Sequence, residues 1–450
     1  MFSKLLGFSN ERHFLKWEKV LNFDCKTMQT LKTVKLQTPK QVRIHLNQHE
    51  AFPCVAVVKK GDEVKIGQVI AKHPELQVAS IHASISGIVV KIDDALLANG
   101  TKTKEIVIEA NGEDQLDPET LPLLIHQQQD FIEALKTSGI AALNTSDFWR
   151  VIEDKETRID TLLVNATLLE PFVTTPIREV LDHSEDVLTG MRALMKWLEI
   201  KKGIIATENH QISGINALND LLPKESQENM PISLKALPAK GANCSNPLLI
   251  QACGEGLSAQ HVLVLNVETV GALARYLKTG LPCTHVNISV AGSAVNEAKN
   301  VLVPIGTPIK DVIAFCGGYK EEPKKILLGG LLTGEAVLSD HETITKQTTA
   351  LFALGQKEAE SGEETACIRC ARCNQACPMK LMPILIDQAV RHHQLDELKQ
   401  LNVAACTECG SCSFICPANR HLVQTIKLGK SVLQQPPASQ NVEKGANLDE

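Results

Sequence analysis

Short apolar stretches separated by turn residues run from about Thr38 to Ala110. Val55–Ala71 has the pattern of a strand, a Gly-Asp turn and a second strand, and Ile81–Ile92 has a turn followed by another strand. Residues 38–112 are therefore predicted to form a small β domain. The preceding residues 1–37 show no clear period and are predicted to be an N-terminal leader.

The pattern then changes to alternating helices and strands in residues 113–280. Four short apolar strands are expected, at Thr161–Asn165, Lys202–Thr207, Ile232–Leu237 and His261–Asn266. Helical periods cover Leu121–Thr137, Ile177–Glu199 and Ser213–Leu222. This alternation predicts a Rossmann-like, doubly wound parallel sheet, whose ligands would bind at the carboxyl ends of the strands. Neither a G-x-G-x-x-G motif nor a P-loop occurs in it.

A second β region follows at residues 281–354, with a helix expected at Ile309–Phe315. We interpret it as a β-grasp module, followed by a polar, charged linker at 355–366. Residues 367–433 hold most of the cysteines, with helices predicted at Met382–Gln400 and Leu422–Leu433. The last residues, 434–450, are predicted to be a disordered tail. The expected fold class is a multidomain α/β plus β chain with a helical C-terminal domain.

Two cysteine runs carry the clearest chemistry. Both have the spacing C-x2-C-x2-C-x3-C-P, which is typical of bacterial proteins with two [4Fe–4S] clusters. The fourth cysteine of each run ligates the other cluster in such proteins. One cluster is then predicted on Cys367, Cys370, Cys373 and Cys416, and the second on Cys406, Cys409, Cys412 and Cys377. Structural zinc sites are the alternative, but these usually pair C-x2-C knuckles.

Composition limits the class of protein and the cellular compartment in which these clusters are expected. The chain has 450 residues and a net charge of -6, which argues against a nucleic-acid-binding protein. Thiolate clusters beside free cysteines favour a reducing compartment. The six other cysteines lack metal spacing and are expected to be mostly small buried hydrophobes: Cys25, Cys54, Cys244, Cys253, Cys283 and Cys316. Neither a signal peptide nor a run of about 18 apolar residues is found, so any membrane association would come through a partner.

The first β region resembles the β-sandwich of biotinyl and lipoyl carrier domains. The place of the carriers' modifiable lysine holds His73–Ala79, which contains no lysine, so a swinging-arm role is not expected. His82 is predicted to be a turn or core residue rather than a ligand.

From about residue 38 onward the chain resembles RnfC, one of the proteins of the Rnf ion-translocating electron transport complex. The resemblance is strongest at Cys367–Gly429, and Val290-Ala-Gly, Val303–Pro308 and Leu328-Gly-Gly carry it through the β-grasp. It implies a carrier-like β-sandwich, a domain similar to the flavin subunit of complex I, a soluble-ligand-binding (SLBB-like) β-grasp and a two-cluster ferredoxin domain. It also implies a cytoplasmic position at the membrane, held there by partner subunits.

The complex I-like region departs from the family at its nucleotide-binding positions. The family's G-x-G-G-x-G-F-P stretch corresponds to Gly139–Trp149, and its N-x-A-E-x-E-P segment to Asn165–Pro171, where Leu168 replaces the first glutamate. A Gly-Ala-Glu-Lys-like stretch has become Gly241–Asn246. Side chains in place of glycine obstruct the approach of a phosphate to backbone amides. FMN and NADH are thus predicted to bind weakly or not at all, with Glu170 the one retained candidate for a cofactor contact.

Four functions follow from these observations. The leading one is an electron-transfer subunit that passes electrons through two clusters to membrane subunits or to ferredoxin or another redox protein. A second retains NADH oxidation at FMN. A third is a soluble RnfC-related reductase of another partner, of the cobalamin-reductase or proline-reductase-associated type. The fourth is a scaffold whose clusters are only structural.

Overall fold

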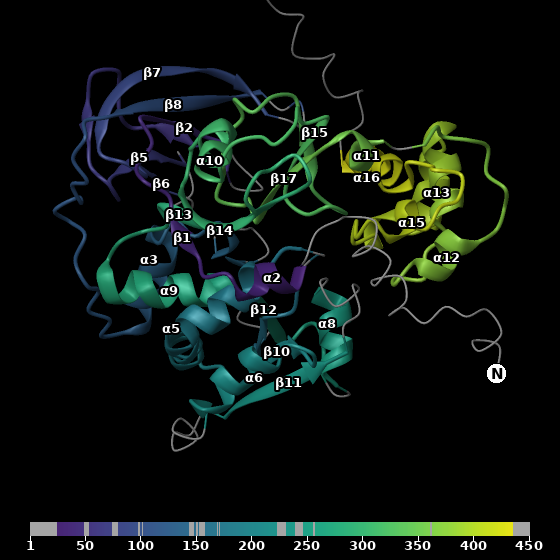
Figure 1. Cartoon of the computed structure of the whole chain (residues 1–450). Helices are drawn as coiled ribbons and strands as arrows, with labels where there is room; N and C mark the ends of the chain where they lie inside the picture. The colour runs from purple at the N-terminus through teal and green to yellow at the C-terminus, as the bar shows by residue number, and fades with distance from the viewer. Residues whose placement is uncertain are drawn as a thin grey trace, which may run out of the picture. The chain divides into compact units, whose positions relative to one another are not determined.

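A computed structural model describes residues 25–48, 54–73, 80–97, 100, 102–143, 148–149, 152, 158–168, 170, 172–222, 231–238, 246–254, 257–360 and 362–434. The chain divides into two compact units, Met1–Ala359 and Glu360–Glu450 (Figure 1). Among the helices in the described ranges, none combines the length and apolar character needed to cross a membrane. The tail predicted at 434–450 lies outside these ranges, apart from its first residue.

The first β domain consists of two small sheets. One has the strand order β2 (Gln41–His45), β8 (Lys102–Ala110), β7 (Gly87–Leu96), β4 (Glu63–Val64), and the other has β3 (Val55–Ala56), β5 (Val69–Lys72), β6 (Ile81–His82). Apolar residues from both sheets, such as Val42, Ile70 and Ile106, form one core between them. The Val55–Ala71 segment therefore does not form one hairpin as predicted. Its strands separate because β4 pairs with β7, while β3 pairs with β5 in the other sheet.

The second domain is built on a four-stranded parallel sheet. Its order is β11 (Ile232–Leu237), β10 (Lys202–Glu208), β9 (Thr161–Asn165), β12 (Val262–Asn266), and every adjacent pair is parallel. The chain moves outward from β9 to β10 and β11, and then returns to place β12 on the other side of β9. Strand order therefore reverses between β9 and β12, which is where doubly wound sheets bind ligands.

Helices α5 (Thr175–Trp197) and α9 (Val267–Thr279) pack against each other beside this sheet (Figure 1). A β-carbon at Gly190 would lie 2.2 Å from the Val270 carbonyl oxygen, so glycine permits the close approach of the two helices. Helix α6 (Ile212–Asn219) lies on the same face as α5 and α9. Helix α8 (Asn246–Cys253) packs on the opposite face, against Leu163, Ile204 and Ala206.

Helix α3 (Gln128–Thr137) begins later than the predicted Leu121. A capping box between Gln127 and Asp130 fixes its start, and the Asp130 carboxylate accepts the backbone N–H of His126 at 3.0 Å and of Gln127 at 3.1 Å. The capping box therefore sets the start of the helix at Gln128, although the apolar residues before it have a helical period.

The β-grasp contains a six-stranded sheet with the order β1 (Val34–Lys35), β14 (Lys299–Pro304), β13 (His285–Ala291), β17 (Ala350–Leu354), β15 (Lys325–Leu328), β16 (Glu335–Val337). Helix α10 (Ile309–Phe315) occurs as predicted. Strand β1 and helix α2 (Cys25–Thr30) belong to the segment predicted as a leader. They are instead part of this domain, because Val34 pairs with Val301 and Met28 is buried in its core. Residues 1–24 of the predicted leader lie outside the described residues.

The C-terminal unit is helical around the cysteine runs, with elements α12 (Arg372–Ala376), α13 (Pro383–Arg391), α14 (Leu395–Gln400), η4 (Val403–Ala405), α15 (Ser411–Phe414) and α16 (Leu422–Gln434). The predicted Met382–Gln400 helix is split, because His393 adopts a left-handed φ of 55° and ends the first part. The predicted linker is also partly helical, as α11 (Gln356–Ala359). Glu358 on α11 accepts the backbone N–H of Ser293 at 3.2 Å, which ties it to the first unit.

Candidate functional site

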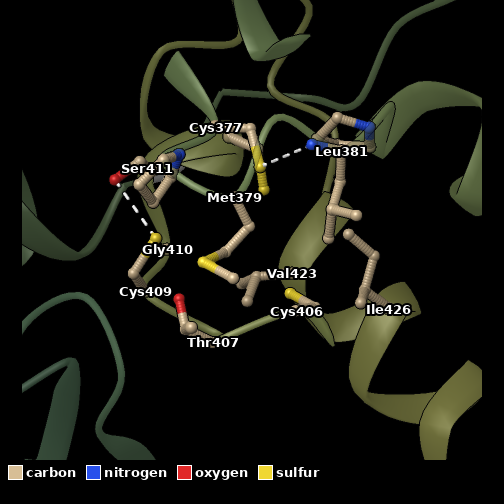
Figure 2. A pocket seen from close by; sticks show the side chains of 13 residues that line it. Cys377, Met379, Leu381, Cys406, Thr407, Cys409, Gly410, Ser411, Val423 and Ile426 are labelled. Atoms are coloured by element: carbon tan, nitrogen blue, oxygen red, sulfur yellow. Dashed lines mark hydrogen bonds between the residues drawn. The ribbon is translucent and has the colours of Figure 1, made fainter. Parts of the chain in front are cut away.

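Four cysteines from both runs line one cavity in the C-terminal unit. They are Cys377 from the first run and Cys406, Cys409 and Cys412 from the second (Figure 2). Among the described residues, no group of three or more His, Cys, Asp or Glu side chains is arranged to hold a single metal ion. The four thiols are instead spread around the wall of the cavity. The predicted ligand set that crosses between the runs is therefore present as one spatial group.

The rest of the cavity wall is mainly apolar. It is formed by Pro378, Met379, Leu381, Pro383, Val423 and Ile426 together with the short Thr407 and Gly410–Ser411 segments. The backbone N–H of Leu381 donates to Cys377 Sγ at 3.3 Å, and that of Glu408 donates to Cys406 Sγ at 3.4 Å (Figure 2 shows the first). Such N–H···S bonds and a dry wall are features that hold and tune iron–sulfur clusters. The residues fit a [4Fe–4S] group.

The two runs share one backbone conformation. Arg369 and Glu408, each just before the second cysteine of its run, both have a φ of 56°. Ala371 and Gly410, just after the second cysteine, have φ values of 57° and 73°. Lys380 and Asn419, three residues after the fourth cysteine, repeat the pattern at 56° and 49°. Left-handed residues at matching positions turn the chain so that successive thiols face a common point. The cysteine spacing requires such turns, but the sequence does not reveal which residues make them.

Electrostatic neighbours identify which thiols are close together. Burial, with contributions from the nearby thiols of Cys406, Cys409 and Cys377, raises the pKa of Cys412 to about 12. Burial likewise raises the pKa of Cys373, with a contribution from Cys416 of the second run. Each third cysteine thus has the fourth cysteine of the other run as a neighbour.

Charged side chains surround the two runs differently. Beside the second run, Lys430 Nζ lies 2.5 Å from Glu408 Oε1 and donates to the Cys406 carbonyl oxygen at 2.9 Å. Beside the first run, Arg420 Nη2 lies 2.6 Å from the fully buried Asp387, which Arg391 also contacts at 3.0 Å. These pairs tie α13 and α16 to the cysteine segments.

The parallel sheet provides a second candidate site where strand order reverses between β9 and β12. Asn165, the last residue of β9, is buried, and its Oδ1 accepts the backbone N–H of Thr167 at 3.0 Å. Its Nδ2 has no hydrogen-bond partner in the described part of the chain. An unpartnered buried amide at the carboxyl end of a strand is the kind of group that binds a ligand. Asn165 was not among the predicted site residues, although a polar residue ending a buried apolar strand is a detectable signal.

Glu170, the retained family glutamate, is engaged within the protein. Its carboxylate accepts the backbone N–H of Leu332 at 2.8 Å and of Thr333 at 3.4 Å, and also the Thr333 hydroxyl. A β-carbon at Gly330 would lie 1.9 Å from Glu170 Oε2, so the β-grasp loop closes directly on this side chain. Glu170 thus fastens the parallel-sheet domain to the β-grasp.

Two further carboxylates, Glu179 and the half-buried Glu268, lie between α5 and α9, and neither was expected. Glu179 is fully buried against Arg275, with Nη1 2.6 Å from Oε1, and burial raises its pKa. Burial also raises the pKa of Glu268 to about 7, and its Oε1 accepts the Thr175 hydroxyl at 3.0 Å. The second oxygen of each carboxylate has no partner among the described residues. The apolar period of a helix predicts which face is buried, but it does not predict a carboxylate on that face.

The glycine-poor stretch is described only in part. Ala141–Leu143 forms a 3-10 turn, η2, with Leu143 fully buried in the core. Gly139 has a φ of 68°, and a β-carbon there would lie 2.7 Å from Nδ1 of the buried His82. Residues 144–147 and 239–245 lie outside the described ranges. The described part of this stretch therefore packs into the protein, and weak FMN and NADH binding stays a prediction.

The cysteines outside the runs follow the expected pattern where they are described. Cys54, Cys253 and Cys316 are buried and Cys283 is partly buried. The side chain of Cys25 and the whole of Cys244 lie outside the described residues. His82 is buried in β6, as expected for a core histidine.

Four sequence families match successive parts of the chain. They are the RnfC barrel sandwich hybrid domain at residues 23–113, the Nuo51 FMN-binding domain at 136–275, the SLBB domain at 287–336 and a 4Fe-4S dicluster domain at 361–430. These matches confirm the predicted fold class and the prediction of [4Fe–4S] clusters.

Curated relatives match most of the chain. The chain is 34% identical to a subunit of the proton-translocating ferredoxin:NAD(+) oxidoreductase complex of Clostridium ljungdahlii, covering 87% of this chain and 88% of that protein. It is 29% identical to the Na(+)-translocating counterpart of Acetobacterium woodii, covering 87% and 90%. Among solved structures, a chain of an NAD+-reducing [NiFe]-hydrogenase is similar at a TM-score of 0.45 and 12% identity, covering 69% of this chain and 63% of the other. From the relatives and the family matches, the chain belongs to the RnfC family.

Proposed function

We propose that this protein is the electron-transfer subunit of an ion-translocating oxidoreductase complex at a membrane. When bound, two [4Fe–4S] clusters supply one-electron transfer. The observation that carries the proposal is the single cavity lined by Cys377 and the three leading cysteines of the second run. The names of the Clostridium and Acetobacterium relatives, each a subunit of a translocating complex, support it.

The proposed ligand sets cross between the runs. Cys406, Cys409, Cys412 and Cys377 hold one cluster, and Cys367, Cys370, Cys373 and Cys416 hold the other. The proximity of Cys373 to Cys416 supports the second set, as the cavity supports the first. Backbone N–H groups from Arg369 and Glu408 stabilise the sulfurs of the first cysteine in each run. The apolar wall excludes water from the set that contains Cys377.

Iron and sulfide analysis tests the clusters. Anaerobically purified protein is expected to contain about eight iron and eight sulfide per chain. Two zinc ions per chain without iron would overturn the proposal.

Double cysteine variants test whether each cluster takes ligands from both cysteine runs. Cys370→Ser/Cys377→Ser removes one ligand from each proposed cluster, so little iron should remain. Cys377→Ser/Cys409→Ser removes two ligands from the same proposed cluster, so about four iron should remain. If each run held its own cluster, these two results would be exchanged. EPR of the second variant should show a single type of cluster.

Membrane subunits are the proposed partners, and the cytoplasmic face of the membrane is the proposed location. Fractionation of cells with and without the neighbouring membrane subunits tests this. The protein should be recovered with membranes only when those subunits are present. Equal recovery in the soluble fraction in both cases would favour a reductase of another partner.

A further inference from the structure

The first cysteine run is open to solvent where the second is covered. Ile368 is 67% exposed, and Arg369, Cys370, Ala371 and Arg372 are exposed as well. The corresponding residues of the second run, Thr407 to Ser411, are all buried or partly buried. The two loops thus have the same backbone conformation, but the loop of the first run is exposed to solvent and that of the second run is covered.

Unpaired positive charge gathers on the open run. Residues 362–434 contain eight Lys and Arg side chains. Five of them pair with carboxylates: Arg391, Lys399, Arg420, Lys427 and Lys430. Within the described part of the chain, Arg369, Arg372 and Lys380 have no such pair, and all three follow cysteines of the first run. The cations within and directly after the first run therefore remain available, whereas the five elsewhere in residues 362–434 are paired with carboxylates.

We propose that the loop Ile368–Arg372 is the docking port for a one-electron redox protein whose surface is acidic around its redox centre. This inference rests on the proposed function. Arg369 and Arg372 attract and orient the acidic surface, Ile368 supplies a small apolar contact, and Cys370 brings a cluster ligand to the contact. The partner loses one electron as the first-run centre gains one, and the reverse transfer uses the same contact.

The features of the loop favour a protein over a membrane surface. Anionic lipid surfaces are recognised by clusters of about four to eight Lys or Arg residues. This loop has two arginines and one exposed aliphatic side chain. A small patch of this composition suits transient redox encounters, which lie at the low end of interface sizes. Charge attraction speeds such encounters and weakens as salt is added.

Binding and electron transfer to an acidic two-[4Fe–4S] ferredoxin, used as the probe, test the port. The variant Arg369→Gln/Arg372→Gln should bind the probe about tenfold more weakly at low ionic strength, because two exposed attractive charges are lost. Microscale thermophoresis measures this, and stopped-flow absorbance should show a similar fall in the second-order rate of electron transfer. The difference from wild type should shrink at high salt.

A matched variant removes the same charge elsewhere. Lys357→Gln/Lys399→Gln, at exposed positions outside the cysteine runs, should change binding and rate less than twofold. Equal effects of the two double variants, or none from the arginine pair, would overturn the port. If Arg369→Gln/Arg372→Gln lost binding to phosphatidylserine vesicles but bound ferredoxin as tightly as wild type, the loop would be a membrane contact and the port would be overturned. Iron content separates the proposals: a wild type without iron refutes the electron-transfer function, whereas failed docking by iron-loaded protein refutes only the port.

Discussion

The cysteine cavity of the C-terminal unit and the strand ends of the parallel sheet are built in opposite ways. In the cysteine runs, ligand groups recur at fixed short spacings, and repeated left-handed residues aim them at common points. In the domain of the parallel sheet, Glu170 is bound to the Leu332–Thr333 backbone and Glu179, on α5, to Arg275. The first region keeps its chemical groups for a cofactor. The second uses most of them to hold elements of the protein together, within the domain and with the β-grasp.

This difference shows why a family motif is informative in one region and less so in the other. A thiolate is a strong metal ligand, and closely spaced cysteines most often bind a metal or an iron–sulfur cluster. The spacing of the cysteines therefore indicates which cofactor they bind. A buried glutamate can bind a ligand, cap a loop or pair with arginine, and only its contacts decide. The following predictions test whether the glutamates are structural and whether the two cysteine runs are equivalent.

The largest effect is expected from loss of the Glu170 carboxylate. Glu170→Ala should lower the free energy of unfolding of the first unit by about 3 kcal/mol, because two backbone N–H groups and a hydroxyl lose their acceptor. Urea unfolding followed by tryptophan fluorescence measures it, since the described tryptophans, Trp149 and Trp197, lie in that unit. Glu335→Ala, at an exposed position of β16, should have little effect. A small effect at Glu170 would return it to the ligand-binding candidates.

The half-buried Glu268 should make stability depend on pH. Its folded-state pKa is raised to about 7 from 4.5, so the protonated form is favoured in the folded protein. This carboxyl therefore costs nothing below pH 4.5, and its cost grows as pH rises toward 7 and is complete above it. Glu268→Gln should be near neutral at pH 4.5 and stabilise the protein by about 3 kcal/mol at pH 8.

Glu179 and Thr175 lie beside Glu268, Arg275 pairs with Glu179, and all three are unchanged in this variant. Thermal unfolding at the two pH values measures the difference. Glu185→Gln, on the exposed side of α5, is the control and should show no such pH dependence. A stabilisation of equal size at both pH values would contradict the role of the titrating carboxyl.

A smaller effect should distinguish the two cysteine loops. Ala371 has a left-handed φ of 57°, whereas the matching Gly410 has a φ of 73° without a side chain. Ala371→Gly should stabilise the C-terminal unit by about 1 kcal/mol, and Gly410→Ala should destabilise it by a similar amount. Loss of iron–sulfur absorbance in urea reports both. Changes of the same sign would show that the loops are not conformationally equivalent.

The smallest effect is predicted for added flavin. Titration with FMN should cause no saturable quenching of flavin fluorescence, since Ala141–Leu143 packs inward and Glu170 is engaged. Added NADH should leave the visible absorbance of the clusters unchanged. Stoichiometric micromolar binding, with bleaching by NADH, would restore NADH oxidation as the function of this domain.

The sequence alone determined those features that depend on short spacing. Cysteine separation specified the iron–sulfur chemistry, and apolar periods located the four parallel strands to within a residue or two. Each of these patterns lies within one segment, and its physical cause is local: ligand geometry in one case and burial of a strand in the other.

Only the tertiary structure decided how distant segments meet. It joined the predicted leader to the β-grasp through β1, separated the predicted hairpin between two sheets, and bound Glu170 to a loop 162 residues away. It also gave the two cysteine runs unequal surroundings, with Glu408 paired to Lys430 and Arg369 left exposed. These outcomes depend on which surfaces pack together, and that is a property of the whole chain rather than of any local pattern.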